Sequence, residues 1–206
     1  MFFDWRTPDA VRTIPELARI LRRPGAVAVV PTETVYGLVG RVSDSACRAR
    51  IYALKHRDDA KPLGRFFSAP DEPEKYGIVL DAAARRLVRG FMPGPLTVIA
   101  PCAAGGTAGF RIPAHPLLLA LLRELGEPLF QTSANRSGSP NALTCADAAA
   151  MLTGRPDAVV DGGPVPPDAL ASTVIDCSGP VPRILRRGAL DLDDFLKNLQ
   201  KGGHHE

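Results

Sequence analysis

The chain lacks the signatures of several large classes of protein. Its four cysteines are far apart and form no CxxC pair, which excludes the common zinc-ligand spacings and a dithiol redox motif. The Walker sequence GxxxxGK[ST], the dinucleotide fingerprint GxGxxG and the nucleophile elbow GxSxG are all absent. The pattern also yields no Ser-His-Asp or Cys-His set, so covalent catalysis is not indicated.

Long apolar runs and a secretion signal are missing too. The longest apolar run near a helix, 116–122, is far shorter than the ~20 residues that a membrane span needs. The N-terminus MFFDWRTPDAVRT has an acid and a proline where a signal peptide has basic and apolar residues. We therefore expect a cytoplasmic protein with no membrane partner. Its cysteines should be small, buried apolar residues.

Charge of one sign is not in large excess. The formal net charge of +3 is too small to make the whole surface attract nucleic acid, although local clusters of Arg and Lys could bind phosphates. With 45% hydrophobic and 23% charged residues, the 206-residue chain has the composition of an ordinary globular domain. We expect one domain over 1–206, with its core at about 13–190 and a short helix and tail at 191–206. The end of the chain, 204–206 (HHE), is expected to be a frayed tail and not a metal site.

Helical and strand patterns alternate along the chain. A capping box at Thr13–Glu16 indicates a first helix that ends at Pro24 and Gly25, and further helices are expected at about 44–55, 81–90, 115–125, 144–152 and 193–200. Asp44 and Thr144 are expected to cap the helices that they begin. Strands are expected at 26–30, 96–100, 110–112, 128–131, 158–160, 172–176 and 183–186. This alternation predicts an α/β fold.

Two of these strands end in clusters of hydroxyl side chains. The strand at 26–30 runs into PTETVYGL (31–38), and the strand at 128–131 runs into TSANRSG (132–138). Open α/β sheets bind ligands at the carboxyl ends of their strands, and hydroxyls both donate and accept hydrogen bonds. Ordinary turns, in which the hydroxyls satisfy the backbone, explain the same pattern.

Cationic residues are concentrated where the second helix should end. Lys55, His56 and Arg57 are followed by Lys61. A solvated basic helix end that complements the helix dipole explains this cluster. The alternative is a triphosphate site, which needs a polyphosphate nearby: arginine can hold two phosphate oxygens while lysine supplies a compact charge.

Three further polar residues lie in segments that should be buried. Arg111 is a single charge in an apolar stretch, where it needs a partner, either a structural carboxylate or a carboxylate of a ligand. Ser172 and Arg186 lie on expected strands and present the same question.

Taken in order, eight motifs resemble the YrdC-type (TsaC-like) threonylcarbamoyl-AMP synthases. They are PTETVYGL, ALKHRDDAKPL, MPGPLTVIAP, FRIPAHPLLLALL, PLFQTSANRSG, DGG, STVID and RILRRG, and they cover about residues 13–190. The resemblance implies a single α/β domain with a twisted mixed sheet and flanking helices around a large basic cavity. It also implies the reaction of ATP, L-threonine and bicarbonate to threonylcarbamoyl-AMP and pyrophosphate. Mg²⁺ would accompany ATP, and a separate transferase would carry the group to tRNA.

The resemblance assigns roles to residues of this chain. Threonine would be bound by Thr32, Arg111, Ser133 and Ser172, with Arg111 pairing the substrate carboxylate. ATP would be held by Lys55, Arg57, Thr107, Asn135, Thr144 and Arg186. Lys55 and Arg57 would position the reactants. No residue would act as a covalent or acid–base group, and no protein ligand to a metal is expected.

Four features depart from the family pattern. Met92 stands where the family usually has Trp, which would remove an aromatic wall. Gly64 and the residues that follow replace an aliphatic strand, and Leu170-Ala171 replace a glycine before Ser172. The printed sequence also stops at Glu206, so we expect it to lack the C-terminal domain of longer relatives.

Two other functions fit the same pattern. A non-catalytic RNA-binding module of this fold would use Lys and Arg in a basic groove, with weak RNA contact that fades with salt, and would not need Thr32, Ser133 and Ser172. Carbamoyl-adenylate formation, as in hydrogenase-maturation carbamoyltransferases, occurs in longer chains with zinc-finger and acylphosphatase modules, and neither module is found here.

Overall fold

The computed structural model describes residues 1–58 and 61–201, and the strands of these residues form a single mixed sheet. Across the sheet the order is β1 (Phe2–Asp4), β8 (Ala158–Asp161), β2 (Ala28–Val30), β3 (Gly37–Arg41), β7 (Leu129–Ser133), β4 (Gly64–Phe66), β6 (Thr107–Arg111), β5 (Leu96–Pro101), β9 (Thr173–Asp176) and β10 (Arg183–Arg186). Parallel and antiparallel neighbours alternate irregularly: β4 runs parallel to β6 but antiparallel to β7. The predicted α/β class with a mixed sheet is confirmed.

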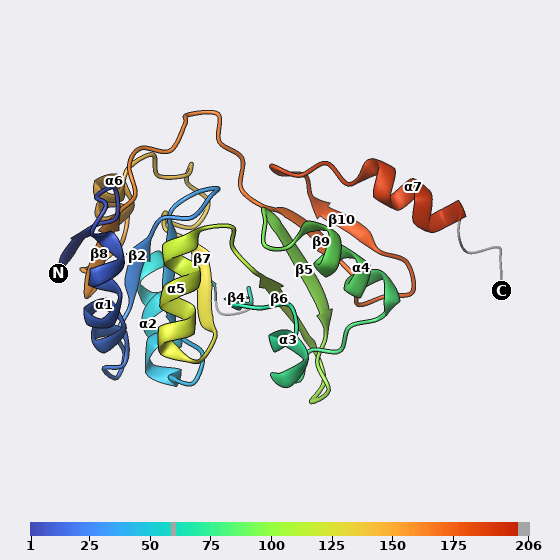
Figure 1. Ribbon diagram of the computed structural model, residues 1–206, viewed down its shortest axis with the longest axis horizontal. Helices are drawn as coiled ribbons and strands as arrows, with labels where there is room; N and C mark the ends of the chain where they lie inside the picture. Colours follow the sequence, from blue (N-terminus) through green and yellow to red (C-terminus); the bar gives the residue numbers. More distant parts are fainter. Residues whose placement is uncertain (59–60, 202–206) are drawn as a thin grey trace.

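Helices cover the sheet in three groups, each with its own apolar cluster. A short 3-10 helix η1 (Ala10–Thr13), α1 (Ile14–Leu21) and α5 (Pro116–Leu125) pack together, and Figure 1 shows α1 and α5 side by side in front of the sheet. The second group consists of α2 (Ser45–Lys55) and α6 (Cys145–Ala150). The third, at the other end of the molecule, consists of α3 (Glu72–Lys75), α4 (Ala82–Phe91) and α7 (Asp193–Lys201).

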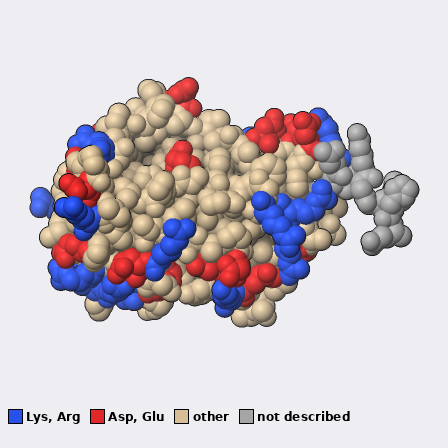
Figure 2. Space-filling view, viewed as in Figure 1, with Lys and Arg blue, Asp and Glu red and all other residues tan. Residues whose placement is uncertain are grey.

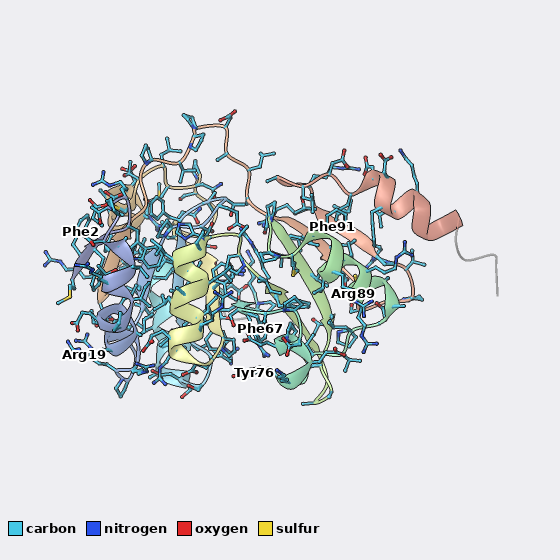
Figure 3. All side chains as sticks on the ribbon, viewed as in Figure 1. Phe2, Arg19, Phe67, Tyr76, Arg89 and Phe91 are labelled. Atoms are coloured by element: carbon cyan, nitrogen blue, oxygen red, sulfur yellow. The ribbon has the colours of Figure 1, made fainter. Side chains whose placement is uncertain are left out.

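Aromatic rings join the third group to the sheet. The ring of Phe67, just after β4, lies 5.6 Å from that of Tyr76 and 6.1 Å from that of Phe110, centroid to centroid. Figure 3 shows Phe67 and Tyr76 together beside α3. Phe91 of α4 packs edge to face on Phe195 of α7. The C-terminal helix is therefore held against the domain by apolar contact.

Of the helix caps expected from the sequence, that at Asp44 is confirmed: its carboxylate accepts hydrogen bonds from the backbone N–H groups of Ala46 and Cys47. The carboxylate of Asp81, for which no cap was predicted, accepts from Ala84 in the same way. The capping box at Thr13 is wrong, because the Thr13 hydroxyl caps nothing. It instead donates to the carbonyl of Ala10 and accepts from the indole nitrogen of Trp5, so tertiary contact replaces the local cap.

Sequence patterns missed three strands: β1, β3 and β4. Strand β3 (GLVGR) is obscured by its glycines, which weaken the strand signal. Gly40 is required by packing, since a Cβ there would come closer than 3.0 Å to Sγ of Cys47 on α2. Glycine thus lets α2 pack closely on the sheet. The same glycine lowers the strand propensity of β3, which is why the sequence pattern does not reveal this strand.

The expectations for cysteines and for the chain end had mixed outcomes. Cys47, Cys145 and Cys177 are buried, and burial raises the pKa of the Cys47 and Cys177 thiols to about 12. Cys102 is only half-buried, which the sequence did not predict. Within residues 1–58 and 61–201, no helix has both the length and the apolar character needed to cross a membrane. The frayed tail expected at 204–206 lies outside the described residues.

Basic side chains gather on the visible surface near α4. Figure 2 shows them there, and α4 carries Arg85, Arg86 and Arg89. Arg85 pairs with Glu74 at 2.6 Å, and the guanidinium of Arg86 lies over the ring of Phe195. Two of these three cations therefore already have partners within the domain.

Candidate active site

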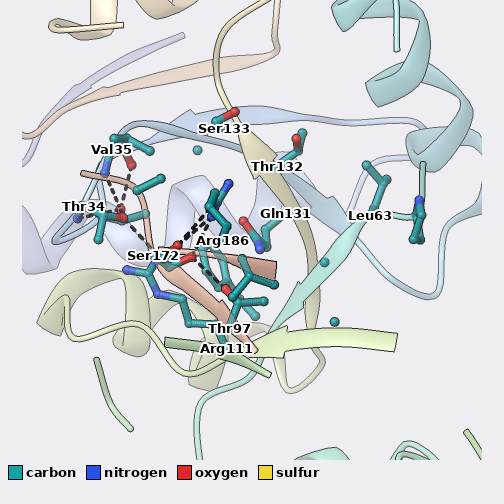
Figure 4. Close-up of a pocket in the computed structure, with 18 of the residues that line it drawn as sticks. Thr34, Val35, Leu63, Thr97, Arg111, Gln131, Thr132, Ser133, Ser172 and Arg186 are labelled. Atoms are coloured by element: carbon teal, nitrogen blue, oxygen red, sulfur yellow. Dashed lines mark hydrogen bonds between the residues drawn. The ribbon is translucent and has the colours of Figure 1, made fainter. Parts of the chain in front are cut away.

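A polar cavity of about 320 Å³ opens over the centre of the sheet. Its walls come from the strands β3, β7, β4, β6, β5, β9 and β10, from the loops at 32–36 and 171–172, and from residues 57, 62 and 63 (Figure 4). Of the ten residues assigned from the resemblance, seven line this cavity: Thr32, Arg57, Thr107, Arg111, Ser133, Ser172 and Arg186. Segments far apart in the sequence therefore meet at one site.

The Thr32 loop is held by its own hydroxyls. Thr32 Oγ1 donates to the carbonyl of Val35 at 2.6 Å and accepts from the backbone N–H groups of Thr34 and Val35. It also lies 3.0 Å from Oγ1 of Thr34. This is the turn that the sequence offered as one of two interpretations, and because both threonines also line the cavity, the two interpretations are compatible.

Arg111 is buried at one end of the cavity, with its side chain only 4% exposed. Its Nε donates to the carbonyl of Gly94 and its Nη1 to Oγ1 of Thr34, both at 3.0 Å. Its Nη2 lies 2.6 Å from Oε1 of Glu33, yet this nitrogen makes no hydrogen bond of acceptable geometry to a described atom. The pair is therefore ionic, and the hydrogens of Nη2 lack a well-directed acceptor among the described atoms.

Glu33 is the structural carboxylate that the sequence left open as a partner for Arg111. Its Oε1 also accepts from the backbone N–H of Ala114 at 2.9 Å, so it ties the Thr32 loop to the segment after β6. Glu33 itself does not line the cavity. Reasoning from the sequence passed over it although it lies within PTETVYGL, because the distance between residues 33 and 111 along the chain hides the contact.

Ser172 and Arg186 form a second polar group at this end. The carbonyl of Ser172 accepts from Nε and Nη2 of Arg186, at 3.1 and 2.8 Å, and its hydroxyl lies 2.8 Å from Oγ1 of Thr97. Burial, followed by the nearby charge of Arg111, lowers the pKa of Arg186. Thr97 was missed by sequence analysis, because nothing in the strand pattern of β5 distinguishes a hydroxyl that faces the cavity.

Lys55 and Asn135 do not line the cavity, but they shape the loop that does. Lys55 is 1% exposed, and its Nζ donates to the carbonyls of Ser133 and Asn135. Burial, followed by the charge of Arg57, lowers the pKa of Lys55 to about 8. Asn135 donates to the carbonyls of Ser139 and Pro140 and accepts from the Ser133 hydroxyl at 2.5 Å. Both residues thus position Ser133, which does face the cavity.

Thr144 also lies outside the cavity lining. Its hydroxyl accepts from the backbone N–H of Asp147 and donates to the Asp147 carboxylate at 2.7 Å, and so it caps α6 as the sequence predicted. Thr144 therefore lies at the N-terminus of α6 and not at the cavity.

The cavity is electropositive. Arg57, Arg111 and Arg186 line it, whereas no Asp or Glu does among the described lining residues. Within residues 1–58 and 61–201, no three His, Cys, Asp or Glu side chains are grouped so that they could hold a metal ion. The site is therefore suited to an anion, with hydroxyls and amides to orient it.

The departures from the family pattern fall in different places. Met92 is buried in the apolar cluster behind α4 and does not line the cavity, so no wall of this cavity depends on an aromatic ring there. Gly64 and Ala171 do line it. Gly94, in the loop after Met92, supplies the carbonyl that fixes Arg111.

Comparison with known sequences gives a consistent family. A family model named Sua5/YciO/YrdC and described as "Telomere recombination" matches residues 20–188. The chain is 36% identical over 188 residues to the threonylcarbamoyl-AMP synthase of Bacillus subtilis, covering 85% of this chain and 54% of that protein. It is 35% identical over 193 residues to the protein of that name from Mus musculus, covering 87% and 68% respectively.

A solved structure has the same architecture. The crystal structure of Pyrococcus abyssi Sua5 complexed with L-threonine superposes with a TM-score of 0.85 at 29% identity, covering 96% of this chain and 60% of that one. The chain thus spans little more than half of the bacterial relative and of the archaeal structure.

Proposed function

We propose a function for this chain, which belongs to the Sua5/YciO/YrdC family. It is an L-threonylcarbamoyladenylate synthase, a nucleotidyltransferase that serves the N6-threonylcarbamoyladenosine modification of tRNA. The observation that carries the proposal is the cavity. Three arginines and no acidic side chain face it among the described lining residues, beside the hydroxyls of Thr32, Ser133 and Ser172. An anionic nucleotide and a small zwitterion need this combination of groups.

The threonine end of the site is the Arg111 end. Arg111 pairs the threonine carboxylate through its under-used Nη2, while Thr32, Ser133 and Ser172 orient the amine and the hydroxyl. Support comes from the P. abyssi structure, which is named as a complex with L-threonine.

ATP occupies the cavity from the end with Arg57 and Thr107 as far as Arg186, which lies beside Ser172 at the Arg111 end. Arg57, Thr107 and Arg186 line it and contact the nucleotide, whereas Lys55 and Asn135 act by fixing the loop at 133–135. For Thr144, which the resemblance also places with ATP, contact is a separate proposal that a substitution can test. Mg²⁺ enters bound to the triphosphate as part of the substrate, because the lining offers hydroxyls and amides but not the carboxylates that usually anchor this ion.

The reaction then needs position and charge neutralisation more than a nucleophile from the protein. The threonine amine loses a proton and adds to bicarbonate, which gives a carbamate and water. A carbamate oxygen attacks the α-phosphorus of ATP, the bond between that phosphorus and the bridging oxygen breaks, and pyrophosphate leaves. Arginine side chains in a confined site stabilise the charge on both phosphate groups, and holding three substrates together supplies much of the rate.

The product is a mixed anhydride that a downstream tRNA threonylcarbamoyltransferase would consume. We also propose that the protein acts in the cytoplasm and that its contact with RNA is weak. The arginines of α4 that already have partners, Arg85 and Arg86, support a limited role for that surface. An RNA-binding module would make no use of the hydroxyl groups around Arg111.

The experiment is to incubate the protein with MgATP and bicarbonate, with and without L-threonine, and to measure pyrophosphate and the nucleotide product. We expect threonine-dependent pyrophosphate and a product heavier than AMP by the threonylcarbamoyl group. The same release of pyrophosphate with and without threonine would contradict the proposal. Carbamoyl phosphate in place of bicarbonate tests the carbamoyl-adenylate alternative.

A further inference from the structure

Gln131 is a cavity residue to which none of the roles above applies. It lies on β7, two residues before Ser133, and its side chain lines the cavity (Figure 4). Its carboxamide makes no hydrogen bond with any described residue, in contrast to the nearby amide of Asn135, which is fully engaged. An amide offers two N–H donors and an oxygen acceptor, so this one is available to a ligand.

Gly64 makes the position of this amide possible. Gly64 pairs with Gln131 across β4 and β7, and a Cβ at position 64 would come closer than 3.0 Å to Nε2 of Gln131. Backbone conformation does not require glycine here, because Gly64 does not have a positive φ. The missing side chain is therefore what lets the amide lie over β4.

The register of the sheet places this amide midway along the cavity. Thr107, Gly109 and Arg111 of β6 are alternate residues that all line the cavity, so Gly109 lies between its two ends. Phe66 of β4 pairs with Arg111, which puts Gly64, two residues earlier, at the middle level. Arg57 donates to the carbonyl of Pro62 and so belongs to the Thr107 end.

We propose that Gln131 is the residue that binds bicarbonate, and that Gly64 sets the position of its amide. This inference rests on the proposed function, in which Arg111 takes the threonine carboxylate and Arg57 and Thr107 hold the triphosphate. The carboxylate group derived from bicarbonate must then lie between the threonine and the triphosphate. Bicarbonate carries oxygen acceptors and one O–H donor, and a carboxamide complements both, whereas the phosphates at the Arg57 end offer acceptors only.

The test measures initial rates against bicarbonate in buffer depleted of CO2, with MgATP and threonine saturating. Gln131→Met keeps the length of the side chain and removes the amide. We expect the KM for bicarbonate to rise about tenfold or more, as for a lost hydrogen bond to a charged group. The KM values for ATP and threonine should change less than about twofold. Gly90→Ala is the matched control for the Gly64→Ala variant described next, because Gly90 lies on α4 and no atom lies near the position that its Cβ would occupy.

Gly64→Ala supplies a second, independent variant. It should raise the KM for bicarbonate as Gln131→Ala does, because the added methyl displaces the amide. In the Gln131→Ala background the same substitution should add almost nothing. Thermal unfolding of each variant confirms that it is folded.

Distinct outcomes overturn different claims. If the wild-type protein is active but the variants keep its KM for bicarbonate, or if the two substitutions simply add, the role of Gln131 is wrong and the proposed function stands. A rise confined to the KM for ATP also rejects bicarbonate as the ligand. If the wild-type protein releases no threonine-dependent pyrophosphate, both proposals fail.

Discussion

Nη2 of Arg111 lies 2.6 Å from Oε1 of Glu33, and both residues belong to segments that form the same end of the cavity. The contact neutralises a buried guanidinium, but it leaves the hydrogens of that nitrogen without a well-directed acceptor. A ligand carboxylate would therefore meet an arginine that already has a competing partner. Under the proposed function, we therefore expect substitutions of the two residues to change the binding of threonine in opposite directions.

Arg111→Ala should weaken threonine binding. Loss of one partner from a buried, hydrogen-bonded charge pair with the ligand costs about 2–5 kcal/mol. Calorimetric titration with L-threonine measures the effect. Arg111→Lys keeps the charge but cannot bind a carboxylate through two parallel N–H groups, so it should retain only part of the threonine affinity that Arg111→Ala loses. Unchanged threonine affinity would show that Arg111 serves the fold through Glu33, Gly94 and Thr34 alone.

Glu33→Gln should have the opposite effect on the affinity for threonine. The amide oxygen can still accept from the N–H of Ala114, but the negative charge that competes for Arg111 is gone. We expect the free energy of unfolding to fall by about 1–3 kcal/mol, because Arg111 loses its counter-ion, and threonine to bind several-fold more tightly. Denaturant unfolding and the same titration give the two numbers. Weaker threonine binding in this variant would contradict competition.

Thr97→Val tests whether the Ser172 hydroxyl needs its neighbour. Valine keeps the shape of the buried side chain but removes the group 2.8 Å from Oγ of Ser172. Stability should change by less than about 1.5 kcal/mol, since the Ser172 hydroxyl retains a contact with Arg186, while the KM for threonine should rise several-fold. Steady-state kinetics with varied threonine measures this.

Thr173→Val is the control for that experiment. Thr173 is the next residue but does not line the cavity, and its hydroxyl binds the carbonyl of Leu190 and two backbone N–H groups, those of Gly188 and Leu190. This variant should lose stability and keep the threonine KM of the folded protein. If both variants shift KM alike, the effect is not specific to the Ser172 hydroxyl.

Thr144→Ala separates two roles for Thr144. Loss of an N-cap hydroxyl costs about 1 kcal/mol of stability, and because Thr144 lies off the cavity we expect the KM for ATP to stay within about twofold. Thr144→Ser retains the cap and is the control. A clear rise of the ATP KM in the alanine variant, with the serine variant normal, would establish the contact with ATP that the resemblance implies.

Sequence analysis predicted the elements that follow from local chemistry. Asp44 and Thr144 cap helices as their positions indicate, and the strands at 26–30 and 128–131 do end at the cavity. The order of the motifs along the chain, and not the chemistry of any one of them, identifies the seven assigned residues that line the cavity.

The remaining features depend on register, which no local pattern contains. Glu33 reaches Arg111, and Thr97 reaches Ser172, across large separations in the chain. The pairing of Gly64 with Gln131 is of the same kind: a glycine that breaks the expected aliphatic strand has a reason only when its neighbour across the sheet is known.

Lys55 gives the last prediction, a change of stability with pH. Burial holds its pKa at about 8 in the folded protein, against an ordinary value of 10.5, which the unfolded chain should have. Between these values the unfolded chain keeps a proton that the folded chain has released, so the free energy of unfolding should rise with pH through this window. Below about pH 8 both states are protonated and the penalty for burying the ammonium is fully present.

The comparison of wild type with Lys55→Met isolates this contribution. Methionine leaves the carbonyls of Ser133 and Asn135 without their donor, which lowers stability at every pH, but it removes the titration. The stability of wild type relative to the variant should therefore grow by up to about 3 kcal/mol from pH 8 to 10.5. Urea unfolding at several pH values measures it. A difference that is constant over that range would mean that the two carbonyls hold the ammonium charged in the folded protein, with a pKa near its ordinary value.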